Sequence, residues 1–324
     1  MKLPSQLVSV PASYFSATLG LTGLGGAWRL AHHVWGYAAL VGELIFAFAG
    51  LVWAYLLIAY VIRWAWSREI ALQEAKDPVQ CCFIGLAGVA TMLVSAALLP
   101  YSRATALVLM LSGFIFTIAF GIWRAGQLWS SERSDNATTA VLYIPTVAGG
   151  FVSAILLAAF GWKEWGQMTF GAALFSWLAI ESVLLRRLYI GPPLPVALRP
   201  TMGVQLAPPA VGLVALLSVS TDAPGIAAHA LLGYALLQCA VLLGRFRWIA
   251  RQAFSPAYWG FSFAVTALGQ APLIMISRGN SQPALALAPV LFGTANLVVG
   301  ILLVGSIKLV FSSKLSPDPK LTSA

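Results

Sequence analysis

Long apolar runs dominate this 324-residue chain and direct it to the membrane. A helix of about 20 apolar residues spans the roughly 30 Å hydrocarbon core and satisfies its own backbone hydrogen bonds. The sequence is 60% hydrophobic and only 9% charged, unlike a soluble domain. The runs predict ten spans, at about residues 12–33, 37–62, 79–99, 104–129, 138–160, 165–189, 197–220, 226–248, 256–277 and 283–311.

The connections between these runs are short, so we expect one all-α polytopic membrane domain over residues 1–324. Its tails are predicted at about residues 1–10 and 312–324. The start of the chain has one lysine and two prolines but no apolar core before a small-residue cleavage site. It therefore does not resemble a cleaved signal peptide, and the first helix is expected to remain.

Lysine and arginine are divided unequally between the two sides of a ten-span arrangement. If both ends of the chain lie on one side, that side carries fifteen basic residues and the other side four. Because cytoplasmic loops collect Lys and Arg, both termini are expected in the cytoplasm. The same bias accounts for most of the net charge of +9, so nucleic-acid binding is not expected.

Proline and hydroxylated residues distinguish the odd-numbered spans. Such residues are tolerated where water or neighbouring helices satisfy the freed carbonyls. The odd spans have interior prolines at Pro145, Pro208, Pro209 and Pro272, whereas the even spans have an interior proline only at Pro289. We expect five helical hairpins, with odd-numbered helices lining a central pore and even-numbered helices outside. The alternative is a packed bundle whose small residues serve helix contacts. The expected pore-lining residues are Ser13, Ser16, Thr91, Ser95, Thr146, Gly149, Ser153, Ser262, Thr266 and Gln270.

The stretch GFSFAVTALGQ, residues 260–270, places a small polar face beside an aromatic ring. At 100° per residue, one arc of about 120° holds most of its small and polar residues, with Phe263 at the edge and Phe261 on the opposite side. A ring beside a thin polar face can fill a lumen and dewet it, which makes a hydrophobic gate. The alternative is that Phe263 is an ordinary core residue. The residues of the arc are Ser262, Phe263, Thr266, Gly269 and Gln270.

Two carboxylates, Glu43 and Glu181, fall inside predicted even-numbered spans. Ionisable residues in the membrane are functional candidates, and a proton-coupled carrier needs one near its substrate path. Their position on outer helices favours structural pairing instead. Glu181 and Arg124 are expected at similar depths, so a buried pair between them is one such arrangement.

Catalytic and cofactor chemistry is not indicated. His32, His33 and His229 lie near span ends rather than as a facing pair, so bis-histidine haem ligation is not expected. The three cysteines have neither metal-ligand nor CxxC spacing, so no metal site is predicted. We find no nucleophile and base constellation in the sequence. Neither an enzyme nor a cofactor is therefore expected.

Four segments carry a resemblance to a known family: PASYFSATLGLTGLGGAW, YIPTVAGGFVSA, RPTMGVQLAPPAV and WGFSFAVTALG. Together they resemble the family of bacterial tellurite-resistance proteins, dicarboxylate transporters and plant slow-type anion channels, over nearly the whole chain. The resemblance implies a homotrimer in the bacterial inner membrane, with one pore of five inner helices in each protomer. It also implies that the second phenylalanine of FSF, here Phe263, blocks that pore. Gly88 stands near an expected proline, so glycine either replaces the kink by flexibility or the pore differs there.

The predicted middles of the odd spans lack acidic and basic residues. A pore without fixed charge binds ions weakly and selects by the ease of dehydration, while basic inner ends concentrate anions. We therefore expect a gated channel for small inorganic anions such as chloride and nitrate. The alternatives are a secondary transporter or exporter of tellurite-like oxyanions, dicarboxylates or lipophilic cations, and a membrane scaffold or sensor with a vestigial pore.

Overall fold

The computed structural model describes residues 10–130, 137–279 and 281–311, and within these ranges the chain forms helices and no strands. The predicted tails lie outside the described residues except for Val10 at the end of the first. Four of the fifteen basic residues expected on the cytoplasmic side also lie outside the described residues: Lys2, Arg133, Lys314 and Lys320.

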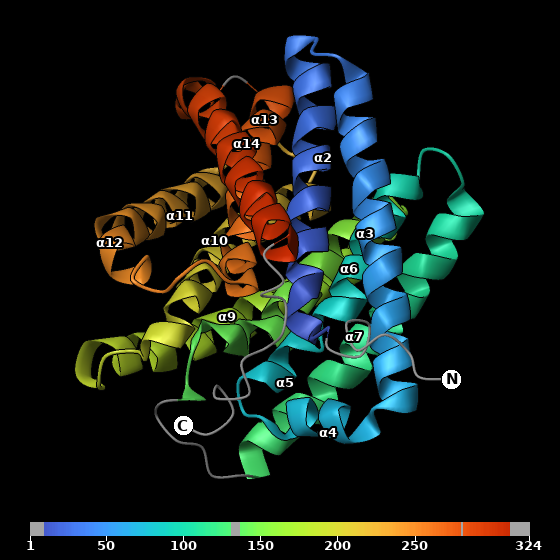
Figure 1. Ribbon diagram of the computed structural model, residues 1–324. Helices are drawn as coiled ribbons and strands as arrows, with labels where there is room; N and C mark the ends of the chain where they lie inside the picture. Colours follow the sequence, from blue (N-terminus) through green and yellow to red (C-terminus); the bar gives the residue numbers. More distant parts are fainter. Residues whose placement is uncertain (1–9, 131–136, 280, 312–324) are drawn as a thin grey trace.

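Long helices account for most of the molecule (Figure 1). Those with predicted outer positions are α3 Ala39–Trp66, α7 Arg103–Ser130, α9 Lys163–Ile190, α11 Ile226–Gly244 and α14 Gln282–Phe311. Those of the predicted inner spans are α2 Phe15–Trp35, α6 Leu86–Leu98, α8 Gly149–Ala159, α10 Ala207–Val219 and α13 Ser262–Arg278. The short elements are η1 Ala12–Tyr14, α4 Arg68–Lys76, α5 Gln80–Phe83, η3 Ala140–Tyr143, η4 Ile144–Ala148, η5 Val196–Leu206, α12 Phe246–Ile249 and η6 Pro256–Phe261.

Within the described ranges, nine helical segments are long and apolar enough to cross a membrane, and they coincide with the second to tenth predicted spans. The first predicted span forms α2, which has 21 residues but is not among the nine. Its glycines, its threonines, Arg29 and two histidines lower its mean hydropathy. The all-helical membrane class is therefore confirmed, whereas α2 as a membrane span, and with it the total of ten spans, stays a prediction.

Burial separates the candidate spans into two layers. In the third, fifth, seventh and ninth spans, 67–83% of the most apolar stretch is buried, against 22–33% in the even-numbered spans. The even-numbered helices instead present large apolar side chains at the surface, such as Leu51 on α3 and Phe175 on α9. An outer face of this kind suits contact with lipid.

The inner helices follow one another around a closed ring. α2 contacts α6, α6 contacts α8, α8 contacts α10, α10 contacts α13, and α13 returns to α2. Each also packs against the next long helix in the chain, as α2 does against α3 and α13 against α14. Figure 1 shows the last of these pairs in orange and red beside the blue pair of α2 and α3.

Four of the five inner spans begin with a 3-10 or π segment before their α-helix. η1 precedes α2, η5 precedes α10 and η6 precedes α13, all three being 3-10 helices, whereas η3 and the π-helix η4 precede α8. Proline lacks an amide hydrogen and is accepted at the start of a helix, where that donor has no partner. Pro145 lies in the first turn of η4, and Pro208 and Pro209 lie in the first turn of α10. These three prolines thus lie where one type of helix gives way to another, whereas Pro272 lies inside α13.

The third span is interrupted before the position discussed in the sequence. Ile84 and Gly85 separate α5 from α6, whereas Gly88 lies inside α6. A Cβ at Gly88 would lie 2.8 Å from the carbonyl oxygen of Gly113 on α7. Glycine at this position permits close packing of two helices, and a kink at Gly88 stays a prediction.

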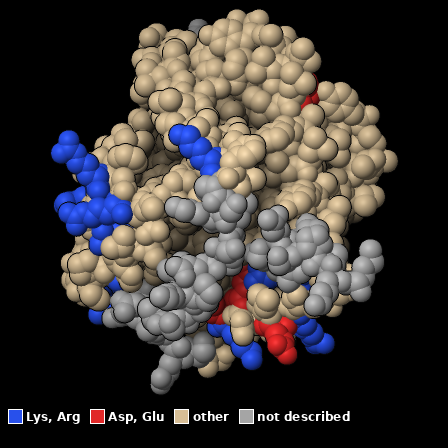
Figure 2. All heavy atoms as spheres, viewed as in Figure 1, with Lys and Arg blue, Asp and Glu red and all other residues tan. Residues whose placement is uncertain are grey.

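Charged side chains are confined to parts of the surface. On the face seen in Figure 2, Lys and Arg lie along the left edge, near the middle and on the lower part, whereas the upper part shows few charges. The lower part includes the region of α4 in Figure 1. This distribution agrees with the unequal division of basic residues in the sequence.

Candidate functional site

Phe263 is the second residue of α13, two residues after the last residue of the 3-10 segment η6. Its side chain is buried, with 8% of its surface exposed. Phe261 is partly exposed, and a Cβ at Gly203 of η5 would lie 2.5 Å from its ring. The two phenylalanines therefore point to different surroundings, as the helical period indicated.

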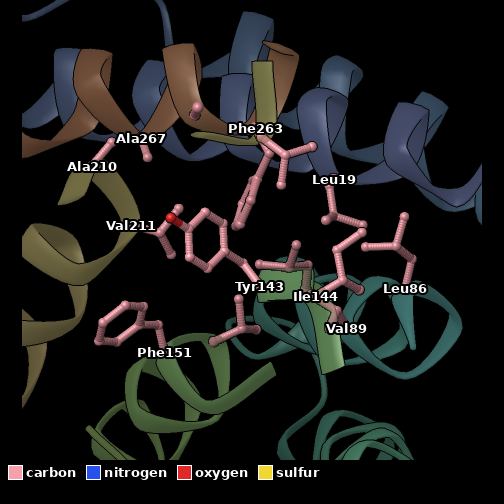
Figure 3. Close-up of a cluster of buried hydrophobic side chains, with 14 of the residues drawn as sticks. Leu19, Leu86, Val89, Tyr143, Ile144, Phe151, Ala210, Val211, Phe263 and Ala267 are labelled. Atoms are coloured by element: carbon pink, nitrogen blue, oxygen red, sulfur yellow. The ribbon is translucent and has the colours of Figure 1, made fainter. Parts of the chain in front are cut away.

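Side chains from all five inner spans gather around Phe263 in one buried cluster (Figure 3). In Figure 3 the Phe263 ring projects from the orange α13 toward the ring of Tyr143. The labelled side chains are apolar apart from the Tyr143 hydroxyl, so an ion at this level would lose its hydration without gaining a charged partner. The cluster includes Leu19, Leu86, Val89, Tyr143, Ile144, Phe151, Ala210, Val211 and Ala267.

The small polar face of α13 meets α2 rather than the cluster. Ser262 and Thr266 are fully buried, and a Cβ at Gly20 or Gly23 of α2 would overlap their side chains. Gln270 Nε2 donates a hydrogen bond of 2.9 Å to the carbonyl oxygen of Gly23. All three polar residues lie at the contact between α13 and α2 in this structure. This agrees with the alternative given above, in which small and polar residues serve helix contacts. Their predicted role in lining a pore stays a prediction.

Three further residues predicted to line the pore face the outer layer. Thr91 Oγ1 accepts a hydrogen bond of 3.0 Å from Trp53 Nε1 on α3. Ser95 Oγ donates one of 2.7 Å to a carbonyl oxygen of α7. A Cβ at Gly149 would overlap Thr117, which also belongs to α7. The hydrogen bonds and the close contact join inner helices to outer ones.

The remaining predicted lining residues lie on η1, α2 and the fifth span. Ser153 Oγ donates to the Gly149 carbonyl at 2.7 Å and lies 3.6 Å from Met92 Sδ on α6. Ser16 Oγ donates to the Ser13 carbonyl at 2.5 Å. Ser13 and Thr146 are half-buried. Ser153 thus lies at a contact between two inner helices, and a lining role stays a prediction for these four.

A small apolar cavity adjoins Tyr143. It offers ≈ 10 Å³ to the centres of water-sized molecules, about the space that one water needs. Its walls come from the fifth and seventh spans and include Val147, Phe151, Val204 and Val211. An apolar cavity of this size gives neighbouring side chains room to move without admitting a chain of water.

Glu181 of α9 is buried and accepts hydrogen bonds from four side chains. Tyr143 donates through its hydroxyl to Oε2, which also accepts from Trp177 Nε1 at 3.0 Å. Tyr234 of α11 donates to Oε1 at 2.5 Å, and Gln205 Nε2 of η5 lies 3.1 Å from both oxygens. These donors satisfy a carboxylate that would otherwise be costly to bury.

The suggested pair between Glu181 and Arg124 is wrong. Arg124 Nη2 donates to the Pro78 carbonyl at 3.2 Å, and Nη1 donates to Gln127 Oε1 at 3.2 Å. Arg124, near the end of α7, is buried. It satisfies the carbonyl of Pro78, which lies in the loop before the third span. Glu181 and Arg124 both make hydrogen bonds within the helix bundle, but with different partners.

The comparisons with known proteins identify the family. A family model described as a voltage-dependent anion channel, SLAC1, matches residues 9–307. The chain belongs to the SLAC1 family. This match covers every helix described above except the last few residues of α14.

Several members of the SLAC1 family show the range of relatives. The tellurite resistance protein TehA homolog of Haemophilus influenzae is 31% identical over 92% of this chain and 90% of its own length. An uncharacterized transporter of Methanocaldococcus jannaschii is 26% identical, over 66% of this chain and 65% of its own. The guard cell S-type anion channel SLAC1 of Arabidopsis thaliana is 21% identical over 93% of this chain, which spans 56% of the plant protein. The resemblance to the tellurite-resistance and plant anion channel family is confirmed.

In this SLAC1-family chain, Glu43 of α3 forms an ion pair with Arg29 of α2. Arg29 lies near the C-terminal end of α2. Glu43 Oε1 lies 2.7 Å from Arg29 Nε, and the Tyr101 hydroxyl donates to Glu43 Oε2 at 2.7 Å. Arg29 also donates to the carbonyl oxygens of Ala96 and Ala97 where α6 ends. Glu43 is therefore paired, as the structural interpretation predicted, and Arg29 ties three helices together.

The segment that enters α2 is held by a buried ion pair. Glu74 of α4 accepts a hydrogen bond of 2.8 Å from the backbone amide of Ala12, and its Oε2 lies 3.3 Å from Arg63 Nη2. Arg63 Nη1 donates to the Val10 carbonyl at 2.8 Å. Burial raises the pKa of the Glu74 carboxyl above its ordinary value of 4.5, and the Arg63 guanidinium offsets part of that rise. The free energy of folding therefore includes a proton linkage at Glu74.

Glu74→Gln should make the stability of the protein less dependent on pH. As pH rises above 4.5, the unfolded chain releases the Glu74 proton before the folded chain does. The wild type should therefore lose stability relative to the variant until the pH exceeds the raised pKa, after which the difference stays constant. Thermal unfolding of both proteins in detergent, from about pH 4 to about pH 8, measures the difference. Parallel stability curves would exclude the linkage.

Proposed function

We propose that this SLAC1-family chain is a gated anion channel whose path runs through the ring of inner helices and is closed by Phe263. The observation that carries the proposal is the gathering of side chains from all five inner spans around one buried phenyl ring (Figure 3). A ring that served only one helix contact would have neighbours from one partner helix. Relatives named as anion channels support the same function.

The chemistry of the closed site favours small anions. The labelled wall around Phe263 presents apolar groups, so the level of the gate selects by the ease of shedding water. Basic residues outnumber acidic ones by 19 to 10 in the chain and favour anions near the side where they gather. Chloride and nitrate, which dehydrate readily for their size, are the proposed permeant ions.

The proposal includes the surroundings of the path. α2 also crosses the membrane and brings the number of spans to ten, the ten spans form five hairpins, and both termini are in the cytoplasm of a bacterial inner membrane. Three copies associate through outer helices, each with its own path. The side chains exposed on the outer layer are large and apolar, which supports contact with lipid or with another copy.

Reversal potentials distinguish a channel from a coupled transporter of oxyanions or dicarboxylates. In bilayers containing the Phe263→Ala variant, the reversal potential should follow an imposed chloride or nitrate gradient. A pH gradient at equal anion concentrations should leave it at zero, because a passive anion path moves no protons. A reversal potential that shifts with the pH gradient would overturn the channel assignment in favour of the carrier.

A further inference from the structure

Tyr143 stands opposite Phe263 in the closed cluster. It is the last residue of η3, immediately before the π-helix η4, and only 1% of its surface is exposed. Figure 3 shows its ring next to that of Phe263, although the two side chains come from different inner spans. The obstruction at this level therefore consists of two aromatic rings from two walls.

The hydroxyl of Tyr143 is held from two directions. It donates a hydrogen bond to Glu181, and it lies 3.1 Å from the Gln205 amide nitrogen, which donates to it. Glu181 itself is fixed by Trp177 and by Tyr234. The carboxylate thus connects two inner segments, η3 and η5, with two outer helices, α9 and α11.

This arrangement restrains a side chain that has room to move. The small apolar cavity lies beside the Tyr143 ring, on the side of Val147 and Val211. A shift of the ring toward it would lengthen the hydrogen bond from the Tyr143 hydroxyl to Glu181, which is unfavourable for a buried polar group. The hydrogen bond to Glu181 therefore opposes any movement of the ring away from the barrier.

We propose that Tyr143 is the second ring of the barrier and that Glu181 is a positioning residue that keeps this ring across the path. The inference rests on the proposed function, since it assigns a second obstruction to the same path. Glu181 acts only through Tyr143 and does not contact the permeating ion, because the phenol ring lies between the carboxylate and Phe263.

Single-channel recording on the Phe263→Ala background tests the inference. Adding both Tyr143→Ala and Glu181→Gln removes the second ring and the carboxylate that would otherwise face the path. The unitary conductance should rise about threefold or more, because permeation depends exponentially on the barrier. Unitary conductance is measured only on folded molecules, so poor folding of some copies does not mimic the result.

The positioning role of Glu181 has its own readout. On the same background, Tyr143→Phe keeps the ring and removes only the hydroxyl, and Glu181→Gln keeps the ring and weakens its acceptor. Both should give the same intermediate conductance with added flicker between open levels, as expected for a released ring. A purely structural role for Glu181 would lower the amount of folded protein and leave the conductance at the Phe263→Ala level.

Phe160→Ala is the matched control, since Phe160 is also a buried aromatic of the fifth span but lies at the end of α8, away from Tyr143 and Phe263 in the sequence. Its ring centre lies 6.1 Å from that of Trp162 and 5.5 Å from the guanidinium carbon of Arg103 on α7. Its removal should leave the unitary conductance of Phe263→Ala unchanged. If Phe263→Ala conducts and the triple variant has the same conductance, the inference is wrong while the proposed function stands. If Phe263→Ala is silent at normal surface expression, the proposed function fails, and this inference fails with it.

Discussion

Phe263→Ala is expected to raise anion current through the membrane by about tenfold or more, which corresponds to a barrier lower by about 1.4 kcal/mol. The substitution removes a buried ring from the centre of a cluster to which all five inner spans contribute. Loss of the ring widens the constriction and lowers the penalty for bringing a hydrated ion into it. Voltage-clamp recording in oocytes, with surface expression measured in the same cells, checks the result.

Phe261→Ala is the control for this experiment. Phe261 is two residues earlier in the same FSF sequence, but it packs against Gly203 of η5. Its removal leaves the Phe263 ring in place, so the current should stay at the wild-type level. An unchanged current in Phe263→Ala with normal surface expression would remove Phe263 from the gate.

Gly23→Val is expected to reduce the amount of folded protein severely. A Cβ at Gly23 would overlap the side chain of Thr266, so valine must separate α2 from α13. Overpacking of this kind costs about 1–3 kcal/mol or more, because close-packed interiors adjust little. Size-exclusion chromatography and thermal unfolding in detergent should show a smaller monodisperse peak and a lower melting temperature.

The matched substitution is Gly50→Val on α3. A Cβ at Gly50 has no other atom within 4 Å, so the added methyl groups enter open space. Its peak and melting temperature should remain close to those of the wild type. Equal melting temperatures for the two valine variants would show that the contact between α2 and α13 is not close in the folded protein.

Hydropathy predicted the spans well because each outer helix is a long uninterrupted run of apolar residues. It described the inner helices less well. α2 contains Arg29 and two histidines near one end, and these residues lie where the helix meets its ion pair with Glu43. A helix that packs among other helices needs less apolar surface than one that faces lipid, so its hydropathy is a weaker signal.

The helical period predicted which residues of the ninth span share a face, but not what that face meets. Separation of Phe263 from Phe261 followed from 100° per residue and agrees with the structure. The polar face of Ser262, Thr266 and Gln270 was expected to line a pore. In the structure it packs against a row of glycines on α2. Glycines three residues apart on the first span were the signal that pointed to this contact.

The surroundings of Glu181 could not be derived from the sequence. Similar expected depth suggested Arg124 as a partner, but depth says nothing of how each helix is rotated or which helices are neighbours. The actual partners come from η3, η5, α9 and α11 and lie up to 53 residues from Glu181 in the sequence. Nothing in the sequence singled out Tyr143. One tyrosine two residues before Pro145 forms no helical pattern with other residues.

The most direct test of the account is whether position 263 lies on the ion path. In a background where Cys81, Cys82 and Cys239 are replaced by alanine, Phe263→Cys should conduct, because the ring is gone. A membrane-impermeant, negatively charged thiol reagent should then abolish the current by placing a sulfonate in the constriction, while the same treatment of Phe261→Cys should leave the current unchanged. Full current from channels whose introduced thiol has reacted completely would contradict the account, because the ions would then pass elsewhere.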